Sequence, residues 1–153
     1  MKFLKKDDKV LLEYNESKKV KNKVKMNGWL FDFENKRFFI KKMFKDIEQH
    51  NFDDVASVNV VEQNHGETKK HTITRGVVGA AIAGPIGAII GVAGKGKQYN
   101  KIDYAGLEIM MKDGSFKEFN VIEAPIKIND GVKIMLNNMN KVYMALTAYI
   151  KSE

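Results

Sequence analysis

Hydrophobic and polar residues alternate along much of the first third of the chain. Between residues 9 and 62 the apolar positions are mainly β-branched or aromatic, which is typical of short strands joined by polar turns. The pattern predicts strands beginning near Val10 and Val20. It also predicts a tight hairpin in which residues 29–33 and 37–40 flank a polar turn.

The same period-two pattern returns further along the chain. Residues 52–63 form the strongest single strand candidate, and residues 70–75 offer another. Residues 107–111 alternate towards Asp113 and Gly114, a dipeptide that favours a hairpin turn before a return strand. We expect Pro125 to close the strand region, because proline cannot donate a ladder hydrogen bond.

The pattern changes to a helical one near the C-terminus. From Asp130 onward, apolar residues recur at steps of three and four, as at Met135, Met139 and Leu146, which predicts one amphipathic helix over residues 130–151. Asn129 or Asp130 is placed to cap it. The expected fold is α+β and mainly β. It is a bent antiparallel sheet or open barrel of about seven strands, covered by the C-terminal helix.

Length and composition fit one domain. The chain has 153 residues, of which 44% are hydrophobic and 29% charged, so we expect a single globular domain over 1–153. Cysteine is absent, which excludes disulfide frameworks and thiolate metal sites. Because the lysine-rich start lacks an apolar signal-peptide core, a cytoplasmic location is expected.

Charge is concentrated at the front of the chain. The net charge is +7, and the first 50 residues carry 14 basic and 8 acidic side chains. Such asymmetry is found in proteins that meet anionic membranes or nucleic acid. However, only Arg37 and Arg75 are arginines, the residue type that gives bidentate phosphate contacts. A solvated lysine surface is therefore favoured over a dedicated polyanion-binding site.

A glycine-rich apolar segment interrupts the strands. Residues 76–94 contain six Gly, five Ala, four Ile, three Val, one Pro and no charge. If the segment formed one continuous helix, its length would be close to the thickness of the hydrocarbon core of a bilayer. Its apolar content is marginal for insertion, and lysines flank it on both sides. Because Gly84 and Pro85 favour a bend in the middle, we expect a helical hairpin that leaves and rejoins one β-rich body.

The segment supplies the candidate binding residues. The side chains expected to face a membrane or partner are Val77, Val78, Ile82, Ile86, Ile89 and Ile90. The glycines expected to allow close helix packing are Gly79, Gly84, Gly87 and Gly91. The basic flank comprises Lys69, Lys70, Arg75, Lys95 and Lys97. Three alternatives stay open: packing over the chain's own sheet, insertion into a membrane surface, and self-association or a partner groove.

The candidate motifs for catalysis and for cofactor binding are incomplete. Residues 91–97 match the glycine and lysine spacing of a phosphate-binding loop, but Gln98 stands where Ser or Thr would bind Mg²⁺. His50, His65 and His71 lack a ligand spacing. Asp53 and Asp54, if placed on a strand, would point to opposite faces. We therefore expect neither an enzyme nor a cofactor, metal or small-molecule substrate.

The order of elements resembles a known family. The strand at Phe52, Asp54 and Val55, the glycine-rich segment at 74–91, and Leu107 with Ile109 before a turn resemble small Gram-positive bacterial and phage proteins of unknown function. Those proteins carry a pleckstrin-homology-like (PH/GRAM-like) domain. The resemblance implies a strongly bent seven-stranded sheet with a terminal helix, used for binding lipids, peptides or proteins.

These observations lead to one functional hypothesis and two alternatives. The leading hypothesis is a non-enzymatic binding module whose hairpin contacts a membrane surface, a protein or a second copy of the chain, which could place it peripherally at the membrane. The first alternative is a phage or mobile-element protein that regulates a host protein. The second, less favoured, is a basic nucleic-acid-binding protein.

Overall fold

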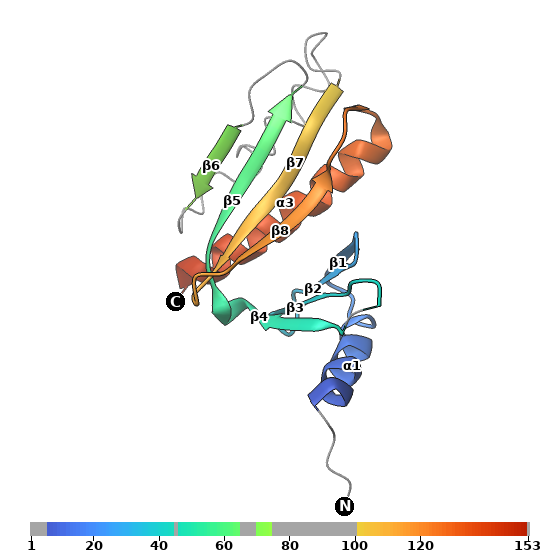
Figure 1. The fold of residues 1–153 in the computed structure, drawn as a ribbon, viewed down its shortest axis with the longest axis vertical. Coiled ribbons are helices and arrows are strands. Elements are labelled where there is room, and N and C mark those ends of the chain that lie inside the picture. The colour runs from blue at the N-terminus through green and yellow to red at the C-terminus, as the bar shows by residue number, and fades with distance from the viewer. Residues whose placement is uncertain (1–5, 45, 65–69, 75–100, 153) are drawn as a thin grey trace, which may run out of the picture. The chain divides into compact units, whose positions relative to one another are not determined.

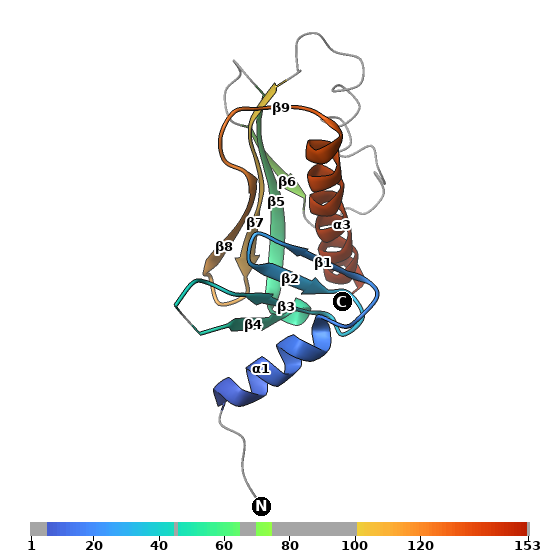
Figure 2. The ribbon, with the colours of Figure 1, turned by 90° about the vertical axis from the view of Figure 1, so that its right-hand side faces the viewer.

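The computed structural model describes residues 6–44, 46–64, 70–74 and 101–152. It divides into two compact units, Met1–Asp54 and Val55–Glu153. The elements of each unit are drawn in Figures 1 and 2. The glycine-rich segment lies outside the described residues.

The first unit begins with a helix where a strand was predicted. Helix α1 spans Lys6–Ser17. The negative charges of Asp7 and Asp8 in its first turn interact favourably with the helix dipole. The strand prediction from Val10 was wrong because the residues that turn inward, Val10, Tyr14 and Ser17, follow a helical spacing. The alternating leucine, Leu12, is 50% exposed, as is Leu11 at 48%.

A four-stranded antiparallel meander follows α1. Its strands are β1 (Lys23–Met26), β2 (Trp29–Asp32), β3 (Arg37–Ile40) and β4 (Glu48–Asn51), in the order β1-β2-β3-β4. The predicted β2–β3 hairpin is confirmed. The lysine-rich stretch before it forms a strand only in its second half, at β1.

Helix α1 packs on this sheet through a small apolar cluster. Tyr14 meets Leu30 and Phe39, with half-buried Val10 and Ile47 at its edge. The rings of Tyr14 and Phe39 meet edge to face at 5.4 Å. Helix and sheet are therefore held together at the position where α1 passes over β2 and β3.

The second unit is built on long antiparallel strands. After a short 3-10 turn, η1 (Phe52–Asp54), the sheet contains β5 (Val55–Asn64), β6 (Lys70–Thr74), β7 (Lys101–Met111) and β8 (Phe116–Ile122) in the order β6-β5-β7-β8. A fifth strand, β9 (Ile126–Lys127), pairs with the start of β7. The expectation that Pro125 ends strand pairing was wrong, because the two residues after it still reach the β7 edge.

The turn and the terminal helix follow the sequence pattern. Gly114 takes a φ of 92° in the β7–β8 turn, where Asp113 Oδ1 accepts a hydrogen bond from Ser115 N at 2.8 Å. Helix α3 spans Asp130–Ser152, and Asn129 caps it by accepting a hydrogen bond from Val132 N at 2.9 Å.

Helix α3 covers one face of the second sheet (Figures 1 and 2). Its buried positions are Val132, Leu136, Met139, Val142, Tyr143, Leu146 and Thr147. In the sheet, buried Val60 of β5, Leu107 of β7 and Phe119 of β8 lie side by side in register. The fold class is confirmed: α+β and mainly β, with open antiparallel sheets and a C-terminal helix.

Candidate functional site

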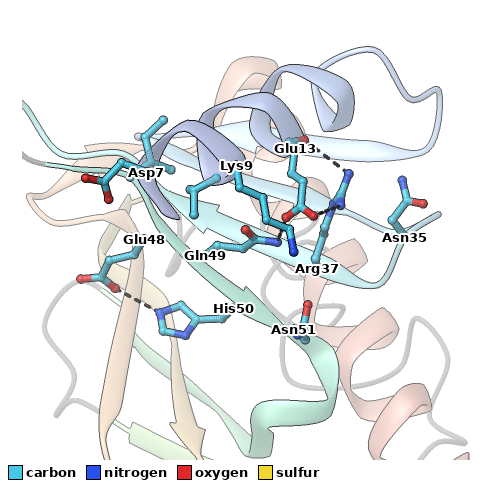
Figure 3. A pocket seen from close by; sticks show the side chains of 11 residues that line it. Asp7, Lys9, Glu13, Asn35, Arg37, Glu48, Gln49, His50 and Asn51 are labelled. Atoms are coloured by element: carbon cyan, nitrogen blue, oxygen red, sulfur yellow. Dashed lines mark hydrogen bonds and ion pairs between the residues drawn. The ribbon is translucent and has the colours of Figure 1, made fainter. Parts of the chain in front are cut away.

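A polar groove of about 730 Å³ lies in the first unit, between the start of α1 and the outer edge of β4 (Figure 3). Strand β4 pairs only with β3 in the described chain, so its other side is a free sheet edge. Residues from both faces of β4 line the groove, which therefore runs along this edge. The lining residues are Asp7, Lys9, Val10, Glu13, Asn35, Arg37, Ile47, Glu48, Gln49, His50 and Asn51.

The register of β4 places backbone groups towards the groove. Phe52 N donates to Lys36 O at 2.9 Å, and Phe38 is paired with His50. Because alternate residues of an antiparallel ladder bond to the partner strand, the backbone groups of Gln49 and Asn51 face away from β3. The N–H of Asn51 is already held by Asp54 Oδ2 at 3.2 Å.

Arg37 is the main cation of the groove, and several acceptors fix its guanidinium group. Its Nε donates to Ser17 Oγ at 2.8 Å, and its Nη2 donates to the carbonyl of Glu13 at 3.3 Å. The carboxylates of Glu13, Glu16 and Asp32 lie 3.8, 3.6 and 3.6 Å from it. The positive charge is thus surrounded by carboxylates on its own unit and is offset before any ligand arrives.

Asp32 is the buried anchor of this network. Its Oδ2 accepts hydrogen bonds from Ser17 Oγ at 2.6 Å and Asn35 Nδ2 at 2.7 Å, and its Oδ1 accepts from the backbone N–H groups of Glu34 and Asn35. Burial acts to raise the pKa of Asp32, but these hydrogen bonds outweigh it and hold the pKa below its usual value. Asp32 therefore stays ionised and ties α1 to the β2–β3 turn.

Further side chains are ordered along the edge strand. Gln49 Nε2 donates to Glu13 Oε2 at 2.6 Å, which links β4 to α1. His50 lies 3.1 Å from the carboxylate of Glu48, and its ring rests 5.2 Å from that of Phe38. Figure 3 shows Glu48 and His50 together on one side of the groove, apart from the Glu13–Arg37 pair.

The charge of the groove contrasts with that of the whole chain. Three carboxylates and two cations line it, in a protein with a net charge of +7. A smaller adjoining hollow of about 300 Å³ adds Asp8, Asp46 and Lys41. The combined surface has a local excess of acidic groups, so it favours a partner that carries positive charge.

The acidic and histidine side chains of the described part of the chain do not gather into a metal site. Residues 6–44, 46–64, 70–74 and 101–152 hold no group of three His, Cys, Asp or Glu side chains that could bind a metal ion. Asp53 and Asp54 lie in the 3-10 turn η1 and not on a strand. Asp54 receives the Asn51 N–H, a structural hydrogen bond.

The site predicted from sequence lies almost entirely outside the described residues. This applies to its apolar positions, its glycines, and Lys69, Arg75, Lys95 and Lys97. Lys70 opens β6, opposite Glu62 of β5. The structure therefore leaves those roles as predictions.

The groove, in turn, was not predicted from sequence. Its residues come mainly from α1, β3 and β4, with Asn35 from the β2–β3 turn and Ile47 from the loop before β4. These elements are separated along the chain, and α1 and β4 carry little apolar patterning. One signal was present in Asp32, a carboxylate in the otherwise apolar stretch 29–33. An acid at such a position needs partners when it is buried, and its partners form one wall of the site.

The fold and the matching family agree on the class of protein. A four-stranded meander, a second antiparallel sheet and a C-terminal helix are the parts of a PH-like binding domain. Residues 9–123 match the family described as glycine zipper containing PH domain, and the chain belongs to that family. Comparison with curated proteins and with solved structures found no match.

Among the helices in the described ranges, none combines the length and apolar character needed to cross a membrane.

Proposed function

We propose that this PH-like module works without catalysis, by using its glycine-rich segment to contact a membrane surface or a protein, including a second copy of itself. The observation that carries the proposal is the uncharged stretch of residues 76–94 between clusters of cations. Apolar side chains bounded by lysines and an arginine are complementary to a surface that is apolar at its centre and anionic at its rim. The proposed location is the cytoplasm, peripherally at the membrane.

The second sheet supports a segment that starts and ends on one side of any membrane. Strand β5 precedes the segment and β7 follows it, yet the two pair along most of their length. A single crossing would leave them on opposite sides of the bilayer. Thr74, the last described residue before the segment, is paired with Val58 of β5, and Ile102, near the start of β7 after the segment, is paired with Asn64 of β5. These positions are about 20 Å apart along β5.

Small residues in the segment support close packing between helices. Gly79, Gly84, Gly87 and Gly91 allow backbones to approach, while the isoleucines and valines listed above remain for the outer contact. The same chemistry serves a membrane surface or another chain. The test must therefore measure both membrane binding and self-association.

Removing the segment tests the proposal. A variant lacking residues 76–94 should lose flotation with vesicles of equimolar phosphatidylcholine and phosphatidylserine, or should lose the mass of an oligomer in light scattering. A milder variant with Ser at Ile82, Ile86, Ile89 and Ile90 guards against misfolding caused by the deletion. Ile134→Ser, at an exposed apolar site on α3, is the matched control. Unchanged flotation and mass in both segment variants would make the segment merely structural.

The groove supports a second candidate function, in which the chain binds and regulates another protein, as a phage-encoded or mobile-element-encoded factor would. Gln49 and Asn51 present backbone groups at a free edge, and acidic side chains surround them. An extended peptide bearing lysine or arginine could add to β4 there by strand pairing. A volume of about 730 Å³ would hold a short segment of such a peptide.

Strand addition predicts a specific sensitivity to proline. Because the N–H of Gln49 faces away from β3, Gln49→Pro should abolish binding of lysine-rich extended peptides selected on the wild type. Gln49→Ala removes the same side-chain bond to Glu13 but keeps the N–H, so it is the matched control. Equal loss of binding in both variants would argue against strand addition.

A further inference from the structure

The two edges of the first sheet carry opposite charge. Strands β1 and β4 are its outermost strands, and within the described chain each pairs with one neighbour (Figure 2). Residues 18–26, which lead into β1 and form it, contain five lysines and no acidic residue. The acidic groove runs along the β4 edge. The two edges are therefore electrostatically complementary to each other.

Carboxylates outnumber cations beside β4 in the described chain. The groove and the adjoining hollow are lined by the carboxylates of Asp7, Asp8, Glu13, Asp46 and Glu48. Their cations are Lys9, Lys41 and Arg37, and Arg37 is already offset by its own carboxylates. Exposed Asp53 and Asp54 directly follow the strand and balance exposed Lys36 and Lys42, which lie in the neighbouring turn and loop.

The backbone of β1 presents hydrogen-bonding groups at the basic edge. Just before the strand, Phe33 N donates to Asn22 O at 3.1 Å. Because the bonded positions alternate along an antiparallel ladder, Val24 is the next residue to bond to β2. The backbone groups of Lys23 and Lys25 therefore face away from β2, as those of Gln49 and Asn51 face away from β3 on the other edge.

The side chains of these two lysines lie on the face of the sheet that carries α1. Lys23 Nζ donates to Lys18 O at 2.6 Å and to Val20 O at 3.0 Å, at the end of that helix. Lys25 is two residues further along the strand, so it shares this face, and it is exposed. An exposed carboxylate, Glu34, accepts the N–H of residue 22 just before the strand and leaves the lysines in excess.

We propose that β1 of one copy of the chain pairs with β4 of a second copy, so that the protein assembles head to tail through the edges of its first sheet. The inference rests on the strand addition at β4 proposed above, with the chain's own lysine-rich strand as the extended partner. Two β1 edges would bring lysines together, and two β4 edges would bring carboxylates together. Charge therefore selects the pairing of unlike edges.

Strand direction and facing also fit this pairing. Neighbouring strands of the first sheet are antiparallel, so β1 and β4 run in opposite directions. A second copy placed beside β4 in the same orientation therefore offers an antiparallel β1. Lys25 then falls opposite Gln49 and Lys23 opposite Asn51. All four side chains lie on the face where Glu13 of α1 holds Gln49 at 2.6 Å.

Such an assembly should be weak and sensitive to salt, because two strands of four residues share few hydrogen bonds and bury little area. The full chain with Ser at Ile82, Ile86, Ile89 and Ile90 is the protein to measure, since it excludes assembly through residues 76–94. Its mass in light scattering should rise above that of a monomer with concentration in low salt. It should return to the monomer in about 1 M salt. A monomer at every concentration in low salt would overturn the proposal.

Mixing two edge variants in this background tests the pairing of unlike edges. Lys25→Pro removes an N–H at the β1 edge, and Gln49→Pro removes one at the β4 edge. Each variant alone should be a monomer, and an equal mixture should form a dimer that does not grow, because only one intact β1 edge and one intact β4 edge meet. Mixtures that remain monomeric, with both variants folded by circular dichroism, would overturn the proposal.

A charge reversal tests the edge without proline. Lys25→Glu in the same background should lose the rise in mass at low salt, because it places a carboxylate against the acidic groove. Lys141→Glu makes the same change in net charge at an exposed position on α3 and should assemble as the parent does. Equal assembly by both variants would contradict the proposed interface.

This inference and the regulation of another protein can fail separately. If lysine-rich peptides bind at β4 and Gln49→Pro abolishes their binding, while the chain stays monomeric, head-to-tail assembly is overturned and the peptide-binding function stands. If the mixed variants form the dimer while free lysine-rich peptides do not bind, assembly stands and regulation through such peptides fails.

Discussion

Asp32 shows how much of the first unit depends on one buried carboxylate. Asp32→Asn should lower the free energy of unfolding by about 2–3 kcal/mol at neutral pH, because an amide group cannot replace an acceptor of four hydrogen bonds beside Arg37. Chemical denaturation measures this change. Glu16→Gln is the matched control, since Glu16 also faces Arg37 but is 59% exposed, and its loss should cost less than about 1 kcal/mol.

The same residue gives a pH dependence with a defined sign. The folded-state pKa of Asp32 lies below its usual value of 3.8, so the stabilising contribution of Asp32 is complete well above that pH and is lost as the pH falls through the folded-state pKa. The stability gap between wild type and Asp32→Asn should therefore narrow below about pH 4. If the difference in unfolding free energy between the two proteins stays constant as the pH is lowered, the charge of Asp32 contributes nothing to stability.

At the scale of elements, hairpins with specific turn residues were the most predictable part of the fold. Asp113 and Gly114 predict the β7–β8 turn because few dipeptides fit such backbone angles, and the turn forms as expected. The helix over residues 130–151 was predictable for a different reason. It is long enough for its period of 3.6 to be distinguished from alternation, and the observed α3 ends one residue later.

Elements with short or mixed patterns were harder to predict. In α1, Val10, Leu12 and Tyr14 satisfy alternation over a few residues, and only the packing of Tyr14 on Leu30 and Phe39 decides for a helix. The groove could not be predicted from the sequence, because strand β4 has the sequence EQHN and carries no apolar pattern. Its pairing with β3 is a tertiary fact that local sequence does not encode.

At the scale of the whole molecule, the organisation into one domain stays a prediction. The described chain forms two compact units that meet in sequence at Asp54 and Val55. The family match over residues 9–123 runs through that boundary and includes both sheets. A family unit of this extent supports a single cooperative domain, and unfolding experiments can decide the matter.

Two spectroscopic probes in different units test whether the chain unfolds as one domain. Trp29, the single tryptophan, reports on β2 of the first unit, whereas within the described residues the far-ultraviolet helical signal comes mainly from α3, with 23 residues against 12 in α1. One domain predicts coincident denaturation midpoints. It also predicts that Leu136→Ala, which empties a fully buried site on α3 and should cost about 2–5 kcal/mol, moves the Trp29 transition as far as the helical one. If the Trp29 midpoint stays in place while the helical midpoint falls, the two units fold independently and the chain is not one domain.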